Sequence, residues 1–402
     1  MPKARTYAVN PEVLIWARER LGLSTEQAAD LLGTSAEELA SIEAGAIPRV
    51  TLLERAATRY QISLATLVAP QPPRNYRRPR DYRTVGGKAA QLSSATLLAM
   101  HEVQFYRHEV LDLVQSLVDS GETEPSALPR VTRRDDPSEV ASIERTRLGV
   151  EFKDQLNWRS AKEAFSGWRW HVEQQGVFVL LKRMPRDDCS GFSFSDDDLP
   201  PTIVVNSTET GQARQFTLFH EYYHLLLRSS GICNERIDVD GHRDERLCNR
   251  FAAAMLMPKD LVVAQARNIS YRSAARTHLW SRQDVERLAS RLKVGRPAMA
   301  IRLEELGLAS SGMAARFVAQ WSAMSSEDTW IEREQEEEKR ELRIPVANKA
   351  LSNWGSGYAG LVFSGLDAGI IDQRDAAQLL NTGTKHFDAI RQRLVRRQEV
   401  YA

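Results

Sequence analysis

Apolar residues recur at helical spacing along most of this chain, whereas strand-like runs gather in one short stretch. The clearest helical stretches are 93–120, 137–148, 215–227 and 243–257. The strand candidates are Val177–Leu181, Gly191–Ser195 and Ile203–Asn206. Side chains return to one face after about 3.6 residues on a helix and after two on a strand. The pattern therefore predicts a mostly α fold with a small β-sheet, of the α+β class.

The first 70 residues read as a bundle of short helices. The predicted helices are Pro11–Leu21, Thr25–Leu32, Ala36–Glu43, Val50–Tyr60 and Ser63–Val68. Ser24 and Ser35 precede two of them, each with Gln or Glu three residues later, which is a typical N-terminal cap. Gly33 is placed to end the second helix, because glycine adopts the left-handed conformation at low cost.

The stretch Leu23–Ser35, followed by Ile42-Glu43-x-Gly45 and Pro48, resembles the phage-repressor (Xre-like) helix-turn-helix. The resemblance implies that the helix after the turn, 36–43, would enter the major groove of DNA. Residues 10–69 hold five basic side chains (18, 20, 49, 55, 59) and eight acidic ones (12, 19, 26, 30, 37, 38, 43, 54), a balance of −3. Basic side chains supply most DNA affinity. Partner docking or dimerisation is therefore an alternative to DNA reading.

A basic segment follows the prolines at 70, 72 and 73. It carries Arg74, Arg77, Arg78 and Arg80, interleaved with Tyr76 and Tyr82. Such a segment could follow a phosphate backbone beside the helical domain. It could equally lie across an acidic surface as a solvated strap. His101 and His108 in the next helix are interpreted as packing or surface residues, because no carboxylate or cysteine set accompanies them.

The sequence His220-Glu221-Tyr222-Tyr223-His224 carries the strongest chemical signal. Residues four apart share a helix face, so both histidines could bind one metal ion while Glu221 reaches a water on it. The helix predicted over 243–257 would bring Glu245 on its first turn as a third ligand. Asn249 would lie one turn later and support the site. His242 and Asp244 are rival third ligands, and Cys248 is interpreted as a small buried residue.

Three ordered blocks resemble the ImmA/IrrE-type zinc metallopeptidases over roughly residues 130–310. They are the strand ending at Asn206, the helix Arg214–His224, and the run from Glu245 to Pro258. The resemblance implies a zincin-like core flanked by helical domains, with Zn²⁺ held by His220, His224 and Glu245 and with Glu221 as the general base. It also implies a protein substrate that is repressor- or antitoxin-like. Tyr222 and Tyr223 depart from the family pattern and are expected to pack.

Length and composition are those of an ordinary multidomain protein. The 402 residues carry a formal charge of +1, so net charge points to no partner. The expected domains are 1–70, helix-turn-helix; 71–130, basic linker and long helix; 131–310, peptidase with trailing helices; and 311–402, a C-terminal helical region. Within the third, 282–308 reads as a second helix-turn-helix or as helices packed on the core. Three cysteines without paired spacing suit a reducing compartment. With no signal-like or membrane-spanning run, a cytoplasmic location is expected.

The sequence thus favours a cytoplasmic zinc endopeptidase that cleaves a regulatory protein, in a stress or mobile-element (toxin–antitoxin) setting. DNA contact through the helix-turn-helix or the arginine segment, and a homodimer, are compatible with it. One alternative is a DNA-binding regulator whose metal site is structural or sensory. Another is an antitoxin-like docking protein that does not cut.

Overall fold

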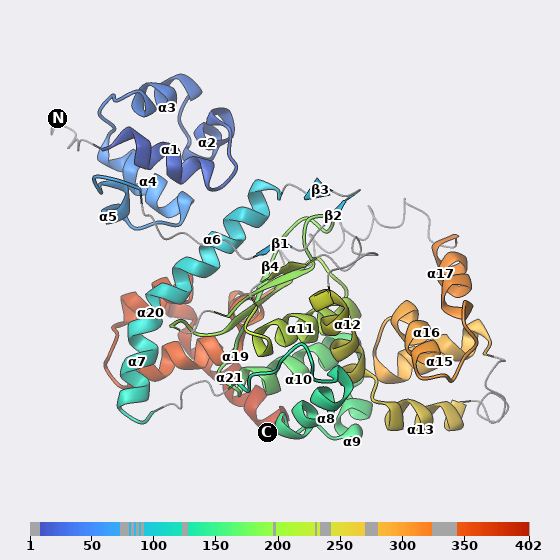
Figure 1. Cartoon of the computed structure of the whole chain (residues 1–402). Helices are drawn as coiled ribbons and strands as arrows, with labels where there is room; N and C mark the ends of the chain where they lie inside the picture. Colours follow the sequence, from blue (N-terminus) through green and yellow to red (C-terminus); the bar gives the residue numbers. More distant parts are fainter. Residues whose placement is uncertain are drawn as a thin grey trace.

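The structure is a computed structural model. It describes residues 9–72, 80–81, 84–85, 88–89, 92–122, 128–195, 198–229, 231–233, 243–269, 280–323 and 344–401. Within these ranges the protein is mainly helical around one principal sheet, which confirms the predicted fold class. Figure 1 shows a small N-terminal bundle joined through α6 to a larger body that holds the sheet. Across the described ranges no helix is both long and apolar enough to cross a membrane.

The N-terminal bundle follows the sequence prediction closely. It comprises α1 (Pro11–Glu19), α2 (Thr25–Leu32), α3 (Ala36–Glu43), α4 (Val50–Tyr60) and α5 (Leu64–Leu67). Ser24 forms a capping box with Gln27, and Gly33 ends α2 in the left-handed conformation at φ +62°. A salt bridge of 2.7 Å between Arg18 and Glu43 ties α1 to α3. The local capping signals are thus realised in the fold.

The predicted helix 93–120 is divided at Val110 into α6 (Ser94–Glu109) and α7 (Leu111–Asp119). Val110 is fully buried in the same core as Leu113 and Leu117, so the bend keeps the apolar sides of both helices on that core. Towards its N-terminus α6 contacts the small bundle, where Nε2 of His101 lies 3.1 Å from the carbonyl oxygen of Arg20. His101 is buried by this contact, whereas His108 is exposed.

The principal sheet has the strand order β1-β7-β5-β6-β4. Its strands are β1 (Arg80–Asp81), β4 (Phe178–Lys182), β5 (Gly191–Phe194), β6 (Thr202–Asn206) and β7 (Gly231–Cys233). β4 and β6 are parallel, and β5 runs antiparallel to both β6 and β7. A two-stranded hairpin of β2 (Thr84–Val85) and β3 (Lys88–Ala89) stands apart. The three strands predicted from sequence are therefore the three longest strands of this sheet.

Both faces of the sheet are buried, and alternate side chains belong to different cores. The first core is formed by α8 (Pro137–Arg147), α10 (Ala161–Glu173), α11 (Gly211–Leu226) and α12 (Arg243–Leu256). The strand side chains that face it are Val179, Leu181, Ile203 and Val205. The short helix α9 (Phe152–Asn157) follows α8. Phe178, Leu180, Phe192 and Val204 face the second core. That core is built by α6, α7, α19 (Val346–Asp367), α20 (Gln373–Leu379) and α21 (Phe387–Tyr401), with a 3-10 turn at Thr384–His386.

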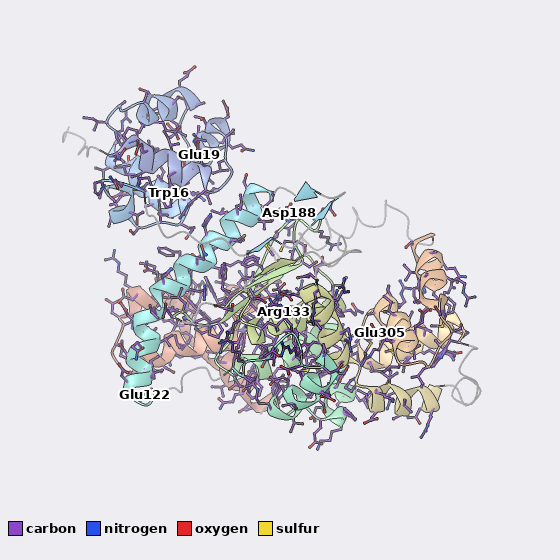
Figure 2. All side chains as sticks on the ribbon, viewed as in Figure 1. Trp16, Glu19, Glu122, Arg133, Asp188 and Glu305 are labelled. Atoms are coloured by element: carbon purple, nitrogen blue, oxygen red, sulfur yellow. The ribbon has the colours of Figure 1, made fainter. Side chains whose placement is uncertain are left out.

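Segments before and after the predicted peptidase region thus cover the second face of its sheet. α19 lies against β4, and Glu173 of α10 accepts hydrogen bonds from the backbone N–H groups of Ser356 and Gly357 in α19 (2.9 and 3.1 Å). Asp188, labelled in Figure 2, accepts from the backbone N–H of Ser93 (3.0 Å) and from the hydroxyl of Thr96 (2.6 Å). The C-terminal region and the helices after the linker are therefore structural parts of the body that contains the site.

A third group of helices follows the peptidase motifs: α13 (Lys259–Ile269), α15 (Arg282–Leu292), α16 (Arg296–Glu305) and α17 (Met313–Ala323). α15 and α16 form the helix pair predicted over 282–308. Leu288, Leu292 and Leu303 belong to the same core as α11. Arg302 is buried and donates to the carbonyl oxygen of Met257 at 3.1 Å. These contacts favour core packing over a second DNA-binding unit; the charge-dense stretch 332–343 lies outside the described residues.

Candidate metal centre

Two packed helices bring the predicted metal ligands together. α11 places His220 and His224 one turn apart, with ring centroids separated by 5.2 Å. α12 packs beside α11 and directs Glu245 at the pair: Oε2 lies 3.1 Å from Nε2 of His220, and Oε1 lies 3.1 Å from Nε2 of His224. All three side chains are at least 95 % buried. The carboxylate therefore spans the two imidazoles inside the protein.

The Nδ1 atoms of both histidines lie within hydrogen-bonding distance of polar side chains. Nδ1 of His220 lies 2.8 Å from Oδ1 of Asn249, and Nδ1 of His224 lies 3.1 Å from the hydroxyl of Ser229. With the amide oxygen as acceptor, the proton of His220 is on Nδ1, which leaves the lone pair of Nε2 for a cation. Asn249 was expected at this place from its spacing to Glu245. Ser229 was not expected, because it lies beyond the helix and follows no motif spacing.

The donor set fits a divalent metal such as zinc. Two imidazole nitrogens and a carboxylate are common zinc ligands, each at about 2.0–2.2 Å. Tetrahedral ligands at such distances from one ion lie about 3.3–3.5 Å from one another, close to the 3.1 Å that separates the carboxylate oxygens from the two Nε2 atoms. These distances are compatible with one ion shared by the three side chains, so the residues fit the metal that the sequence predicts.

Glu221 lies in the same enclosure, fully buried. Its Oε2 accepts a hydrogen bond of 2.7 Å from the hydroxyl of Ser193 on β5. Its Oε1 is buried and has no hydrogen-bond partner among the residues described here. Burial raises the pKa of Glu221 above its ordinary value, and the neighbouring His224 and His220 oppose that rise. Ser193 has no sequence signal, because only the packing of β5 on α11 brings it near.

A glycine permits that packing. A methyl group at Gly191, the first residue of β5, would stand 2.4 Å from Cγ2 of Thr217 on α11 and 2.8 Å from the carbonyl oxygen of Val204. Ordinary carbon contacts are near 3.5–4.0 Å. The absence of a side chain at this position therefore lets α11 approach the strand that carries Ser193.

The rival third ligands have different positions. Burial alone would raise the pKa of Glu245, but the imidazoles of His220 and His224 hold it well below its ordinary value. Asp244 instead accepts two hydrogen bonds of 2.6 Å from Arg133, which lower the pKa of Asp244. Figure 2 labels Arg133 beside the sheet and its helices. Asp244 is thus engaged in a salt bridge with Arg133, and His242 lies outside the described residues.

Cys248 is fully buried, in keeping with its interpretation as a small interior residue. One potential ligand atom each from Cys248, His220 and His224 lie within 4.8 Å of one another, and the thiol has Glu245 and Glu221 as charged neighbours. The sequence alone predicts no chemical role for this cysteine.

The remaining predicted residues lie away from this cluster. Arg74, Arg77 and Arg78 lie outside the described residues, and Arg80 is described only as a backbone position in β1. Tyr222 packs inside and donates to Glu144 at 2.7 Å, and the ring of Tyr223 lies 4.7 Å from that of Phe251. Both tyrosines therefore serve packing, as expected.

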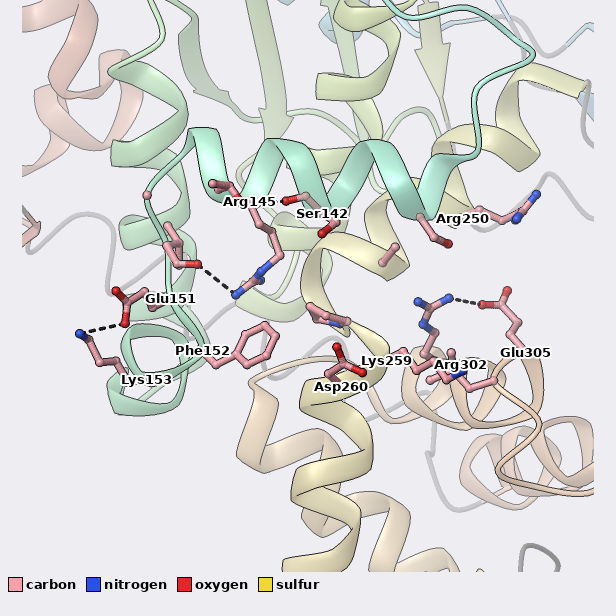
Figure 3. Close-up of a pocket in the computed structure, with 17 residues that line it drawn as sticks. Ser142, Arg145, Glu151, Phe152, Lys153, Arg250, Lys259, Asp260, Arg302 and Glu305 are labelled. Carbon is pink, nitrogen blue, oxygen red and sulfur yellow. Dashed lines mark hydrogen bonds and ion pairs between the residues drawn. The ribbon is translucent and has the colours of Figure 1, made fainter.

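A cavity of about 1110 Å³ lies between α8, α9, α12, α13 and α16. Figure 3 shows its lining, in which Arg145, Lys153, Arg250, Lys259 and Arg302 alternate with acidic groups. Most of these cations already have partners: Arg250 pairs with Asp136 and Lys153 with Glu151. None of the metal-cluster residues lines it. The candidate metal centre therefore lies outside this cavity.

Comparisons with known families agree with this arrangement. The model of the IrrE N-terminal-like domain, a peptidase family, matches residues 172–304. A helix-turn-helix domain model matches residues 13–69. A search of curated proteins finds no significant match. The matched peptidase segment contains the sheet strands β4 to β7, the helix α11 with both histidines, and α12 with Glu245. Segments of this protein therefore match an IrrE N-terminal-like domain of a peptidase family and, ahead of it, a helix-turn-helix domain.

Proposed function

We propose that this protein is a zinc-dependent endopeptidase that cleaves a regulatory protein. One observation carries the proposal: a single carboxylate, Glu245, lies 3.1 Å from Nε2 of both His220 and His224, while Asn249 and Ser229 hold the opposite ring nitrogens. Three protein ligands with one open position are typical of catalytic rather than structural zinc sites. The peptidase family match supports the same reading.

The residues around the ligands have distinct tasks. A bound Zn²⁺ would polarise the scissile carbonyl and lower the pKa of a coordinated water. Glu221 accepts the proton of the attacking water on Oε1, because Ser193 already occupies Oε2. It can then pass that proton to the leaving amine. Burial raises the pKa of Glu221, which favours proton uptake because a carboxylate with a higher pKa is a stronger base.

The proposed substrate is a repressor- or antitoxin-like protein, and the setting is a stress or mobile-element response. A helix-turn-helix domain in the same chain supports a regulatory role. This domain contacts α6, which in turn packs against the sheet of the peptidase body. Binding at the N-terminal bundle can therefore bring a target close to the peptidase. We expect the protein to act in the cytoplasm, and a homodimer is compatible with this scheme.

A second function of the bundle is favoured by its charge. The helix after the turn, α3, exposes Glu37 and Glu38 where a DNA-reading helix would meet phosphates. Because phosphate neutralisation requires basic side chains, we propose that the bundle docks a protein partner, with DNA contact depending on additional basic residues such as the arginine segment at 74–80. Salt-dependent binding to its own promoter that persists after the arginines at 74, 77, 78 and 80 are replaced by alanine would contradict the docking role.

The chemistry is tested by Glu221→Gln, which keeps the size of the side chain and removes the base. The wild type and variant are co-expressed with the products of neighbouring genes, and a truncated partner is sought by mass spectrometry. We expect the variant to bind zinc stoichiometrically and to lose cleavage by about 10²–10⁴-fold. The matched control is Glu399→Gln at an exposed position of α21, away from both the metal centre and the N-terminal bundle, which should cleave normally. Cleavage at the wild-type rate by Glu221→Gln, or full zinc content in His220→Ala, would refute the proposal.

A further inference from the structure

Three residues on one face of α12 lie towards the imidazoles of His220 and His224. Glu245 contacts both Nε2 atoms, and Asn249 holds Nδ1 of His220. Cys248, between them in sequence, contributes a sulfur to the group of potential ligand atoms that lie within 4.8 Å of one another. Residues three and four apart share a helix face. The cysteine is therefore on the ligand-bearing face of the helix, about 4.5 Å further along its axis than the acid.

Cys248 belongs to the apolar core around α11, but it also has polar neighbours that a mere space-filling residue would lack. Its charged neighbours are the carboxylates of Glu245, Glu221 and Asp244, and both imidazoles complete the group. In the same enclosure Oε1 of Glu221, fully buried, has no hydrogen-bond partner within the described part of the chain. Burial of two imidazoles, two carboxylates and a thiol in one place is energetically unfavourable unless a cation binds among them, because buried charged groups need partners.

We infer that Cys248 is an additional ligand of the metal site, which closes the coordination of the metal in the substrate-free protein and holds the peptidase latent. The inference rests on the proposed function. Structural zinc sites have four protein ligands and no open position, whereas catalytic sites keep one open for water. Two imidazoles, one carboxylate and one thiolate make four, and zinc accepts all three kinds of donor.

The exchange balances without an oxidant or reductant. On closing, the S–H bond of Cys248 breaks and its proton passes to solvent, while a sulfur lone pair forms the bond to the cation and a water molecule leaves it. On opening, the carbonyl oxygen of a bound substrate or a water replaces the sulfur, and the thiolate regains a proton. Because Cys248 lies on α12, a small shift of this helix against α11 would decide between the two states.

Cys189 provides a matched control. It is also fully buried, but its thiol donates to the carbonyl oxygen of Gly191 at 2.8 Å in the second core. It therefore reports what loss of a buried thiol does to the fold when no metal is near.

The test is a titration of the purified, metal-free full-length chain with Co²⁺, a spectroscopic substitute for zinc. We expect a near-ultraviolet thiolate-to-cobalt band in the wild type and in Cys189→Ser, and its loss in both Cys248→Ser and Cys248→Ala. The Zn²⁺ affinity of Cys248→Ala, measured by chelator competition, should be at least about tenfold lower than that of the wild type. Loss of a residue that only hydrogen-bonds to a metal ligand already lowers metal affinity by about 10–100-fold. Circular dichroism shows whether each variant is folded. If one of the two Cys248 variants is not folded, the thiolate band is compared with the wild type in the other.

The outcomes separate the two proposals. If Co²⁺ binds to the wild type through imidazoles, with visible bands that His220→Ala removes, but the thiolate band is absent, Cys248 is not a ligand and the proposed peptidase stands. The inference is also overturned if the band survives in Cys248→Ser. If the folded wild type binds neither Co²⁺ nor Zn²⁺, the metal site itself is refuted, and the role of Cys248 falls with it.

Discussion

Replacing Asn249 by alanine probes the support of the metal site without touching a ligand. The change removes the oxygen that lies 2.8 Å from Nδ1 of His220. A buried N–H left without an acceptor costs about 1–3 kcal/mol, because His220 is only 1 % exposed and water cannot replace the amide. Loss of such a partner typically weakens metal binding by about 10–100-fold, which corresponds to about 1.4–2.8 kcal/mol. The first figure applies to the folded protein with or without the metal, so we expect Zn²⁺ affinity to fall by the second, about 10–100-fold.

The assay is competition for Zn²⁺ against a chromogenic chelator at constant pH. Asn249→Asp retains an acceptor oxygen, so its affinity for Zn²⁺ should be no more than a few-fold below that of the wild type. Ser229→Ala should show a smaller loss than Asn249→Ala, because its contact to His224 is longer at 3.1 Å. Asn348→Ala changes an exposed residue paired with Arg393 and should be neutral. Wild-type affinity in Asn249→Ala, or an equal loss in Asn348→Ala, would refute the reasoning.

Two further predictions concern folding. Gly191→Ala should lower the free energy of unfolding in urea by about 1–3 kcal/mol through overpacking, with partial recovery in a double variant with Thr217→Ser, whereas Gly383→Ala, in open space, should be near neutral. The pKa of Asp244 is lowered chiefly by Arg133, so its carboxylate adds stability above its unfolded pKa of about 4 that disappears as the pH falls towards its lowered folded value. The stability difference between wild type and Asp244→Asn should therefore shrink between about pH 5 and 3; a constant difference would argue against this salt bridge.

Local signals in the sequence were sufficient for most individual elements. α2, α3 and α4 begin and end at the predicted residues. The side chains of Ser24 and Ser35 cap the starts of α2 and α3, and Gly33 ends α2 in the left-handed conformation. The break between α6 and α7 was not predicted, since both halves carry continuous helical periodicity. Its position depends on where Val110 meets the core beneath the sheet, which is a tertiary contact.

The candidate site shows the same division. The spacing of His220, Glu221 and His224 on one helix was readable, because it needs only the geometry of a single turn. Ser193 and Ser229 could not be found in this way. Ser193 meets Glu221 across the interface of β5 and α11, and Ser229 meets His224 only after the chain has turned beyond the helix.

By itself, the sequence determined the helical and strand segments, the pair of imidazoles on one helical face and the adjacent carboxylate, because these depend on contacts within a few residues. Only the tertiary structure decided which of two neighbouring acids meets the imidazoles. Asp244 and Glu245 are separated by about 100° around α12, and the packing of this helix on α11 turns Glu245 inward while Arg133 engages Asp244. It also decided that Cys248 lies among the ligands, since residues distant in sequence meet only where helices pack.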